Sequence, residues 1–368
     1  MEALALSSHL EGLLDRRWRP RLSLTSSERD NLFRWDGSTR DHFETYLVKV
    51  ALPEHQAALW IRHEIRLAAR ARIAPRLRVV AVFYDLRTGK HHSFVQHEAL
   101  SSLDFSRRRF WVRVGGCELT QAGAVGMISD GALRWNLRWE PRRVSARPLL
   151  WEPLYEVDWL PSKMLIPNEA VPTWGQIVVA GRVLDVRGAL AQQQHQWGRR
   201  SPRRWMACHV DSFEDRPHCR LEAFQVQDWL NGQPSPWLSS VRVTYRHRTY
   251  FFPRIVSDLS NTGQDAREDG WSFSCGRGPL HFRGEVRVPR ELYTAVRFED
   301  PDGSQRVIST AAGASAVLEV LRRGGLRFHR ELLVRSHRMG WYELAGEDAV
   351  PGADELTAFV PGDPTHRG

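Results

Sequence analysis

The segment from residue 192 to residue 209 places polar side chains next to large aromatic ones. It begins as Gln-Gln-Gln-His-Gln-Trp-Gly (192–198) and, after Pro202, continues into a strand-like stretch that carries Trp205 and His209. Aromatic rings supply apolar contact area, and a few placed polar groups orient a bound molecule. Residues of these types around a turn are therefore typical of the mouth or floor of a ligand pocket.

The elements that must position such a pocket are predicted to be strands. Apolar residues alternate with polar ones over several short runs, which is the period of a half-buried strand. These runs lie at residues 59–67, 77–83, 133–139, 241–245 and 286–288. Turn signals such as Asn231-Gly232 and Gly324-Gly325 separate them. Short antiparallel strands with few, short helices favour an all-β fold built from barrels or sandwiches.

A cluster of prolines between residues 153 and 172 separates two strand-rich halves of similar length. We predict one barrel from residues 26–165 and one from residues 166–348, each with about eight or nine strands, a size that holds one small ligand. Residues 1–25 are expected to form a helical or extended N-terminal segment. Residues 349–368, rich in proline and glycine, are expected to be a flexible tail.

The chain carries a net charge of +9, and its only lysines are Lys49, Lys90 and Lys163, so the charge is mostly arginine. With 15 tryptophans, this composition would suit binding of nucleic acid through phosphate contacts and base stacking. The arginines are spread along the chain, however, and fall on the strand face opposite the aliphatic residues. We expect that face to be a solvated exterior, so nucleic-acid binding is kept only as a third hypothesis.

The four cysteines, Cys117, Cys208, Cys219 and Cys275, form no CxxC pair and have no zinc-site spacing. Free thiols in a reducing compartment fit this pattern best, so we expect a cytoplasmic protein without metal. No P-loop or dinucleotide fingerprint is present, and no cofactor is expected. The N-terminus lacks the pattern of a signal peptide, and no apolar run is long enough for a membrane span. Peripheral membrane contact and the oligomeric state stay open.

Several motifs of this chain resemble those of a known family and occur in the same order along the sequence. The run Gln194-His195-Gln196-Trp197-Gly198, followed by Pro202-Arg203-Arg204-Trp205, is similar to a segment of the tocopherol cyclases and of hydroxyneurosporene synthase, a carotenoid hydratase. Residues 41–50 are similar to the opening strand of that family, and residues 59–67 and 79–85 to its paired early strands. Residues 316–321 and the run Gly340-Trp341-Tyr342-Glu343 resemble its closing strands.

The resemblance implies a tandem lipocalin-like fold, in which two β-barrels lie side by side with an apolar pocket. It also implies a large hydrophobic ligand, isoprenoid- or polyketide-like, handled without metal or nucleotide. In the family, the position of Gln194 carries an acid that protonates an alkene or a ring bond. Glutamine offers only hydrogen bonds, so the family mechanism lacks its acid in this chain.

His195 is the candidate replacement for that acid, because an imidazolium can donate a proton near neutral pH. The alternative is a turn residue without chemistry. Trp197 either plugs the space between strands or contacts the ligand. Trp205 and His209 share a strand face, since four residues separate them, and His209 is then either a core residue or a polar group in the pocket. The predicted catalytic residues are His195 and Gln194, and the predicted ligand-binding residues are Gln192, Trp197, Trp205 and His209.

Two acids in predicted strands are further candidates for the interior of the first barrel. Glu44 and Glu64 could both point inward. Glu64 shares its strand face with Arg62 and Arg66, which favours a salt-bridge ladder on the surface instead.

The leading hypothesis is a protein that binds a bulky hydrophobic small molecule, with cofactor-free cyclase, hydratase or isomerase chemistry on it. The close alternative is a non-catalytic carrier of such a molecule. The acid missing at Gln194 favours the carrier, whereas the polar, tryptophan-rich cluster favours the enzyme.

Overall fold

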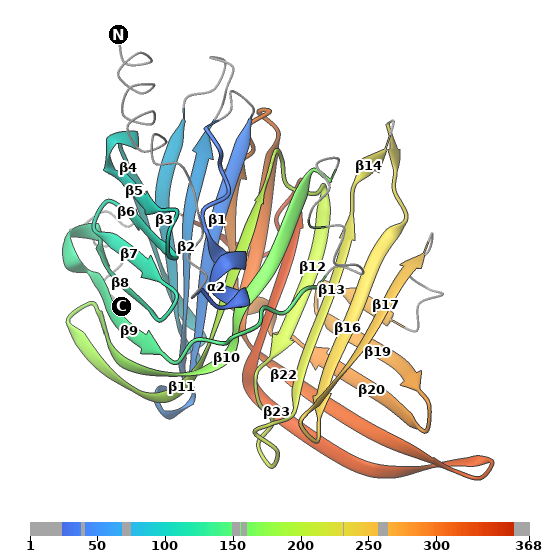
Figure 1. Cartoon of the computed structure of the whole chain (residues 1–368). Helices are drawn as coiled ribbons and strands as arrows, with labels where there is room; N and C mark the ends of the chain where they lie inside the picture. The colour runs from blue at the N-terminus through green and yellow to red at the C-terminus, as the bar shows by residue number, and fades with distance from the viewer. Residues whose placement is uncertain are drawn as a thin grey trace.

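The computed structural model describes residues 24–37, 41–67, 75–148, 155, 160–230, 232–256 and 264–356. These residues form two large sheets, nearly all antiparallel, and α2 (Ser26–Asn31) is the α-helix among them (Figure 1). The predicted all-β, two-barrel fold is thereby confirmed. Of the predicted N-terminal segment, only residues 24 and 25 lie within the described part. No helix in that part is long and apolar enough to cross a membrane.

The first sheet rolls into a barrel. Its strands are β1 (His42–Leu52), β2 (Ala57–Leu67), β3 (Arg76–Asp85), β4 (Lys90–Glu98), β5 (Leu103–Ser106), β6 (Trp111–Val114), β7 (Cys117–Thr120), β8 (Gly123–Ile128), β9 (Leu133–Trp139), β10 (Ser162–Val179) and β11 (Arg182–Gly198). Their order in space is β4-β3-β2-β1-β11-β10-β9-β8-β7-β6-β5. The two end strands, β4 and β5, are joined by the short turn η2 (Leu100–Ser102). The sheet must therefore curl enough to bring the end of β4 to the start of β5, although the two strands do not pair.

The second sheet repeats this plan. Its main strands are β12 (Arg204–Val210), β13 (Arg220–Gln227), β16 (Trp237–Tyr245), β17 (Arg248–Val256), β18 (Gln264–Arg267), β19 (Gly270–Arg277), β20 (Leu280–Arg287), β22 (Gln305–Gly324) and β23 (Arg327–Gly346). Their order is β17-β16-β13-β12-β23-β22-β20-β19-β18. In the first sheet the first strand pairs with the last, β1 with β11, and in the second sheet the first strand, β12, pairs with β23. The strands at the two ends are again consecutive in the chain.

A few short elements complete the described fold. They are β14 (Trp229–Leu230), β15 (Gln233–Pro234), β21 (Tyr293–Glu299), β24 (Asp354–Glu355) and the 3₁₀ turns η1 (Pro53–His55), η3 (Ser129–Gly131) and η6 (Arg290–Leu292). Strand β24 pairs in parallel with β21, so the chain is held at this point of the predicted flexible tail. Residues 357–368 of that tail lie outside the described residues.

The chain passes from the first sheet to the second between Gly198 and Arg204. The boundary predicted at 165/166 falls inside β10, which pairs with β9 and β11 of the first sheet. The physical reason is closure, because β11 has to return to β1 before the first barrel is complete. Each sheet consequently has eleven strands, against the eight or nine predicted.

The face that β2 and β3 turn toward the second barrel corrects one expectation. Arg62, Arg66 and Arg78 are buried, being 5–8% exposed. Arg62 pairs with Glu64 at 2.7 Å, Arg78 pairs with the same carboxylate, and Arg66 pairs with Glu299 at 2.5 Å. The salt-bridge ladder predicted around Glu64 exists, but the prediction of a solvated exterior is wrong here, because the second barrel covers this face. Alternation alone cannot tell a covered polar face from a wet one.

Helix α2 and the residues after it close the mouth of the first barrel. The hydroxyl of Thr25 caps the helix by accepting a hydrogen bond from the backbone N–H of Glu28 at 3.2 Å. Beyond the helix, Leu32, Phe33 and Trp35 are buried in the hydrophobic core of the first barrel. This packing fixes the chain across the open end of the barrel.

Candidate functional site

Strand β11 carries four of the six predicted site residues, and its alternation sends them to opposite faces. Gln194 lines a small cavity between the two barrels, and Gln192 lies on the same face. His195 and Trp197 face the inside of the first barrel, where the His195 ring stacks on Tyr46 with centroids 4.4 Å apart. The structure therefore divides the predicted pocket residues between two places.

Inside the first barrel, the carboxylate of Glu44 is the centre of a buried hydrogen-bond cluster. It is 0% exposed. Its donors are the backbone N–H groups of Arg34 (2.8 Å) and Trp35 (3.3 Å), the hydroxyl of Tyr46 (2.6 Å) and Nε2 of both His42 (2.9 Å) and His195 (2.9 Å). Burial raises the pKa of Glu44, but the hydrogen bonds from the two histidines outweigh it and hold the pKa at about 2. Glu44 is therefore an anion that orients its neighbours and cannot supply a proton.

Each ring nitrogen of His195 faces a hydrogen-bond acceptor. Its Nε2 lies 2.9 Å from Glu44, and its Nδ1 lies 3.2 Å from the backbone carbonyl oxygen of Asp30. Burial lowers the pKa of His195, although the hydrogen bond to Glu44 opposes that shift. The Glu44 carboxylate and the Asp30 carbonyl oxygen can only accept, so both contacts are hydrogen bonds at once only in the imidazolium. In the neutral imidazole, which burial favours, Nε2 donates to Glu44 and the contact between Nδ1 and the Asp30 carbonyl oxygen is not a hydrogen bond. That nitrogen faces Asp30 and the mouth of the barrel.

A cavity of about 490 Å³ opens at this mouth. Its wall combines aromatic and aliphatic side chains with four arginines and one acid. The lining residues are Ser26, Arg29, Asp30, Leu32, Phe33, Arg34, Arg107, Arg147, Tyr155, Leu165 and Trp197. Arg34 lies over the Trp197 ring, 4.9 Å from its centroid, and Arg147 pairs with Asp30 at 3.3 Å. We call this space the mouth cavity.

Trp197 and Asp30 separate the mouth cavity from His195. The Trp197 ring lies 4.7 Å from the His195 ring, centroid to centroid, and His195 is 0% exposed. Both separating residues belong to the cavity wall. The imidazole thus lies one side chain behind the surface that a bound molecule would touch.

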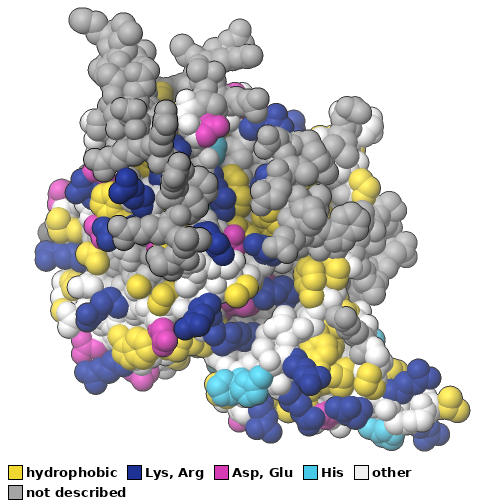
Figure 2. All heavy atoms as spheres, viewed as in Figure 1, with side chains coloured by type: hydrophobic (Ala, Val, Ile, Leu, Met, Phe, Trp, Pro, Cys, Tyr) yellow, Lys and Arg dark blue, Asp and Glu magenta, His cyan; other side chains and the backbone are white. Residues whose placement is uncertain are grey.

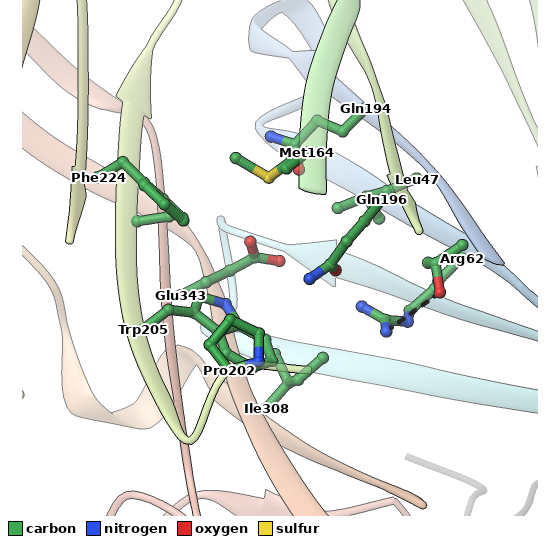
Figure 3. Close-up of a pocket in the computed structure, with 12 residues that line it drawn as sticks. Leu47, Arg62, Met164, Gln194, Gln196, Pro202, Trp205, Phe224, Ile308 and Glu343 are labelled. Atoms are coloured by element: carbon green, nitrogen blue, oxygen red, sulfur yellow. Dashed lines mark hydrogen bonds between the residues drawn. The ribbon is translucent and has the colours of Figure 1, made fainter. Parts of the chain in front are cut away.

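The second cavity lies between the two barrels and measures only about 30 Å³. Figure 3 shows Gln194, Gln196 and Arg62 entering it from the first barrel, and Trp205 and Glu343 from the second. This volume is enough for a water molecule or two and not for an organic ligand. We call it the inter-barrel cavity.

A buried ion pair lies beside the inter-barrel cavity. Nζ of Lys49 is 3.0 Å from the Glu343 carboxylate, and both side chains are 7% exposed or less. The indole N–H of Trp60 also donates to Glu343, at 3.0 Å. Close by, Gln194 donates to the Gln192 side-chain oxygen at 2.5 Å, while Nε2 of Gln192 is buried without a hydrogen-bond partner. The contacts of Lys49 and Trp60 with Glu343 join the two barrels.

Trp205 and His209 lie on β12, on the side that faces the first barrel. Trp205 is 7% exposed and packs against Phe298, with ring centroids 6.0 Å apart. His209 lines neither cavity. Its ring lies parallel to Trp341 at 6.1 Å, its Nε2 makes no hydrogen bond, and burial holds its pKa well below the usual range. His209 therefore resembles a core residue, one of the two alternatives left open by the sequence.

Sequence reasoning named Glu44 as a candidate for the interior of the first barrel, but it missed the partners His42 and Tyr46 that share its strand face. His42, Glu44 and Tyr46 are two residues apart on β1, so one strand face carries three polar groups. That spacing, inside an otherwise apolar strand, was a usable signal. Lys49 was another, because only three lysines occur in the chain and this one sits between valines. Among the described residues, no group of three or more His, Cys, Asp or Glu side chains could hold a metal ion.

Comparison with solved structures supports the fold. The crystal structure of CghA superposes with a TM-score of 0.51 at 10% identity, covering 91% of this chain and 97% of that chain. A proposed AttH from Nitrosomonas europaea gives 0.49 at 12% identity, over 91% and 99% of the two chains, and kievitone hydratase from Nectria haematococca gives 0.46 at 10%, over 90% and 93%. No family model and no curated protein matches the sequence. The likeness to CghA, at this identity, establishes the predicted tandem lipocalin-like fold and nothing finer.

Proposed function

We propose that this protein binds a bulky, largely hydrophobic small molecule in the mouth cavity. The observation that carries the proposal is the volume of about 490 Å³ at the mouth, against about 30 Å³ between the barrels. Pockets for organic ligands commonly measure roughly 300–1,000 Å³. The mouth cavity falls in that range, and its wall offers the aromatic surface that such ligands use.

The wall also indicates the chemistry of the ligand. Phe33, Tyr155 and Trp197 supply apolar area for a ring system or an isoprenoid chain. Four arginines and a single acid line the same space, which favours a ligand that also carries a carboxylate or another anionic oxygen group. We therefore expect an amphiphile with an apolar body and an anionic end.

Cofactor-free proton transfer is the reaction that the neighbouring cluster would support. With the Asp30 carbonyl displaced from Nδ1, the neutral His195 would accept a proton from the ligand at that nitrogen and return it at another carbon or oxygen, which is the chemistry of an isomerase or a cyclase. The anion of Glu44 would stabilise the imidazolium formed in between. The sequence proposed His195 as an acid; its lowered pKa favours a base that becomes an acid only after the first transfer.

A carrier without catalysis is the second candidate, and one observation favours it. His195 is 0% exposed, so Trp197 or the backbone at Asp30 has to move before a ligand can reach the imidazole. Nucleic-acid binding has weaker support, because only Trp174 and Trp229 are exposed among the described tryptophans, at 48% and 36%. A base-stacking surface needs several exposed rings.

Ligand binding is tested with the purified full chain. Native mass spectrometry would reveal a molecule that co-purifies, and anilinonaphthalene sulfonate, an aromatic anion, serves as a fluorescent probe. Trp197→Ala should weaken probe binding about tenfold or more, because a large aromatic contact is lost. Phe224→Ala, in the wall of the inter-barrel cavity, is the matched control and should leave the affinity unchanged. Equal affinities for wild type and Trp197→Ala would remove the mouth cavity as the binding site.

His195→Gln distinguishes the enzyme from the carrier. Glutamine keeps a polar side chain but cannot exchange a proton at neutral pH. If the molecule that co-purifies is converted by the wild type, that turnover should be lost in the variant while binding persists. A wild type that binds the molecule without converting it would establish the carrier instead.

A further inference from the structure

The hairpin formed by β22 and β23 ends in a tip that no other described element covers. In Figure 1 it projects from the second barrel, away from the first. Pairing with β20 ends at Arg322, and Gly324 pairs with Arg327 across a turn of two residues, Gly325 and Leu326. Gly325 has a φ of +63°, which glycine adopts readily. The tip is thus a tight turn beyond the last strand of the barrel.

Every residue from Arg322 to Arg330 is exposed, and we call this stretch the hairpin tip. Leu326 is 96% exposed, the highest value among the large hydrophobic residues of the described chain, and Phe328 is 50% exposed. The Phe328 ring packs on one side against His281, at 5.6 Å between centroids. A leucine in a hairpin turn, where small polar residues are usual, contributes nothing to the core of the barrel.

The charge of the tip is positive. It contains four arginines and no acid. Two of the four are matched from the strands below, Arg322 by Glu331 at 2.5 Å and Arg330 by Glu319 at 2.8 Å. Four arginines and these two glutamates leave a net charge of +2. The other two, Arg323 and Arg327, flank the turn on either side of Leu326. Figure 2 shows basic side chains around hydrophobic ones at this end of the molecule.

We propose that the hairpin tip docks on a membrane surface that contains anionic lipids. Leu326 and Phe328 enter the headgroup region, and Arg323 and Arg327 bind lipid phosphates beside them. A nucleic acid would explain the arginines but would leave the two apolar side chains in water. The proposal is independent of the mouth cavity, although a protein that handles a hydrophobic molecule would meet it at such a surface.

Insertion of the hairpin tip into the membrane is tested with the full chain, labelled with a fluorescent dye at position 326. The four native cysteines are buried, so Leu326→Cys can be labelled selectively with an environment-sensitive fluorophore. Vesicles of phosphatidylcholine with phosphatidylserine should shift the emission to shorter wavelength, and vesicles of phosphatidylcholine alone should not. Val144→Cys is the matched control, since Val144 is 71% exposed and lies far from the tip in the sequence. Unchanged emission at position 326 with anionic vesicles would overturn the proposal.

Co-sedimentation with unlabelled protein tests the charges. Arg323→Ser/Arg327→Ser should lower the affinity for anionic vesicles about tenfold or more, and added salt should lower the wild-type affinity as well. Arg108→Ser/Arg109→Ser, an exposed pair on the first barrel, should bind like the wild type. Equal binding of anionic vesicles by both double variants would contradict the proposal that the hairpin tip is the docking site. The proposal would also be overturned if the wild type did not bind vesicles and the tip instead bound short RNA. Dimerisation through the tip, abolished by Leu326→Ser, in place of vesicle binding would overturn it as well. A far-ultraviolet circular dichroism spectrum and a melting temperature like those of the wild type verify that each variant is folded.

Discussion

The mouth cavity and the inter-barrel cavity lie on the two sides of β11, and they differ in what fills them. On the inner side, His195 and Glu44 form a compact charged cluster beneath an open space of about 490 Å³. On the outer side, Gln194 and the Lys49–Glu343 pair lie in a seam that leaves about 30 Å³. Polar residues of similar type thus lie beneath an open cavity on one side and between the packed barrels on the other.

This difference indicates that the role of a buried polar group depends on whether an open cavity lies beside it. A buried ion pair between two packed surfaces is costly to form, and its partners fix how the surfaces meet. A buried carboxylate with a neutral imidazole next to an open cavity can exchange protons with a ligand. The comparison predicts that outer-side substitutions change stability without changing binding, whereas inner-side substitutions change binding, stability or both.

The largest effect is expected from breaking the ion pair of the seam. Lys49→Met leaves the Glu343 carboxylate buried without its cation, which should lower the free energy of unfolding by about 3–5 kcal/mol. The double variant Lys49→Met/Glu343→Gln removes both charges, keeps an acceptor for Trp60 and should recover much of the loss. Urea unfolding of the wild type, the single variant and the double variant measures these free energies. A double variant as unstable as the single one would contradict an ion-pair origin.

Trp205→Ala should destabilise the fold by about 3 kcal/mol, because a buried indole leaves a cavity against Phe298 and its neighbours. Its affinity for the fluorescent probe should stay unchanged at temperatures where it is folded. This variant is the sharpest challenge to the comparison. Loss of probe binding from a folded Trp205→Ala protein would move the ligand to the space between the barrels.

Glu44→Gln should cost about 3 kcal/mol at neutral pH, with a defined dependence on pH. The pKa of Glu44 is about 2 in the folded state and 4.5 ordinarily, so its stabilisation is complete above about pH 4.5 and is lost as the pH falls toward 2. The difference in unfolding free energy between wild type and variant should shrink over that window. Asp211 and Glu222, whose pKa values are raised by burial to about 7, change stability with pH in the opposite direction. Their contributions are the same in wild type and variant, so they cancel in the difference. A difference that stays constant from pH 7 to pH 2.5 would show that the carboxylate charge is not what matters.

The smallest effect is expected from Gln194→Ala. One hydrogen bond to Gln192 is lost, worth about 1 kcal/mol in unfolding free energy. Probe affinity and any turnover should match the wild type, because the side chain points away from the mouth cavity. Thermal unfolding together with a probe titration measures both quantities. A selective loss of turnover would restore Gln194 to the catalytic role that its sequence position suggests.

The strands and their faces were predictable from the sequence, because alternation is a local property. In β9, Leu133, Trp135, Leu137 and Trp139 point inward and the polar residues between them point outward, as the pattern predicts. The tandem fold followed from motifs in the right order. The strand parity of Trp205 and His209 was likewise readable from their spacing. Each of these inferences requires only neighbours along one strand.

What the sequence could not determine is how distant segments come together. Glu44 and His195 are 151 residues apart and meet only because β1 closes the barrel on β11. Whether a polar face is wet or covered was equally hidden, since Arg62 and Arg66 are buried only by the second barrel. The position of the open cavity also depends on α2 lying across the mouth. The sequence by itself determined which side chains share a strand face; closure of the sheets and packing of the barrels decided which of them meet and which have space beside them. The physical reason is that alternation acts over two residues, whereas burial depends on surfaces assembled from the whole chain.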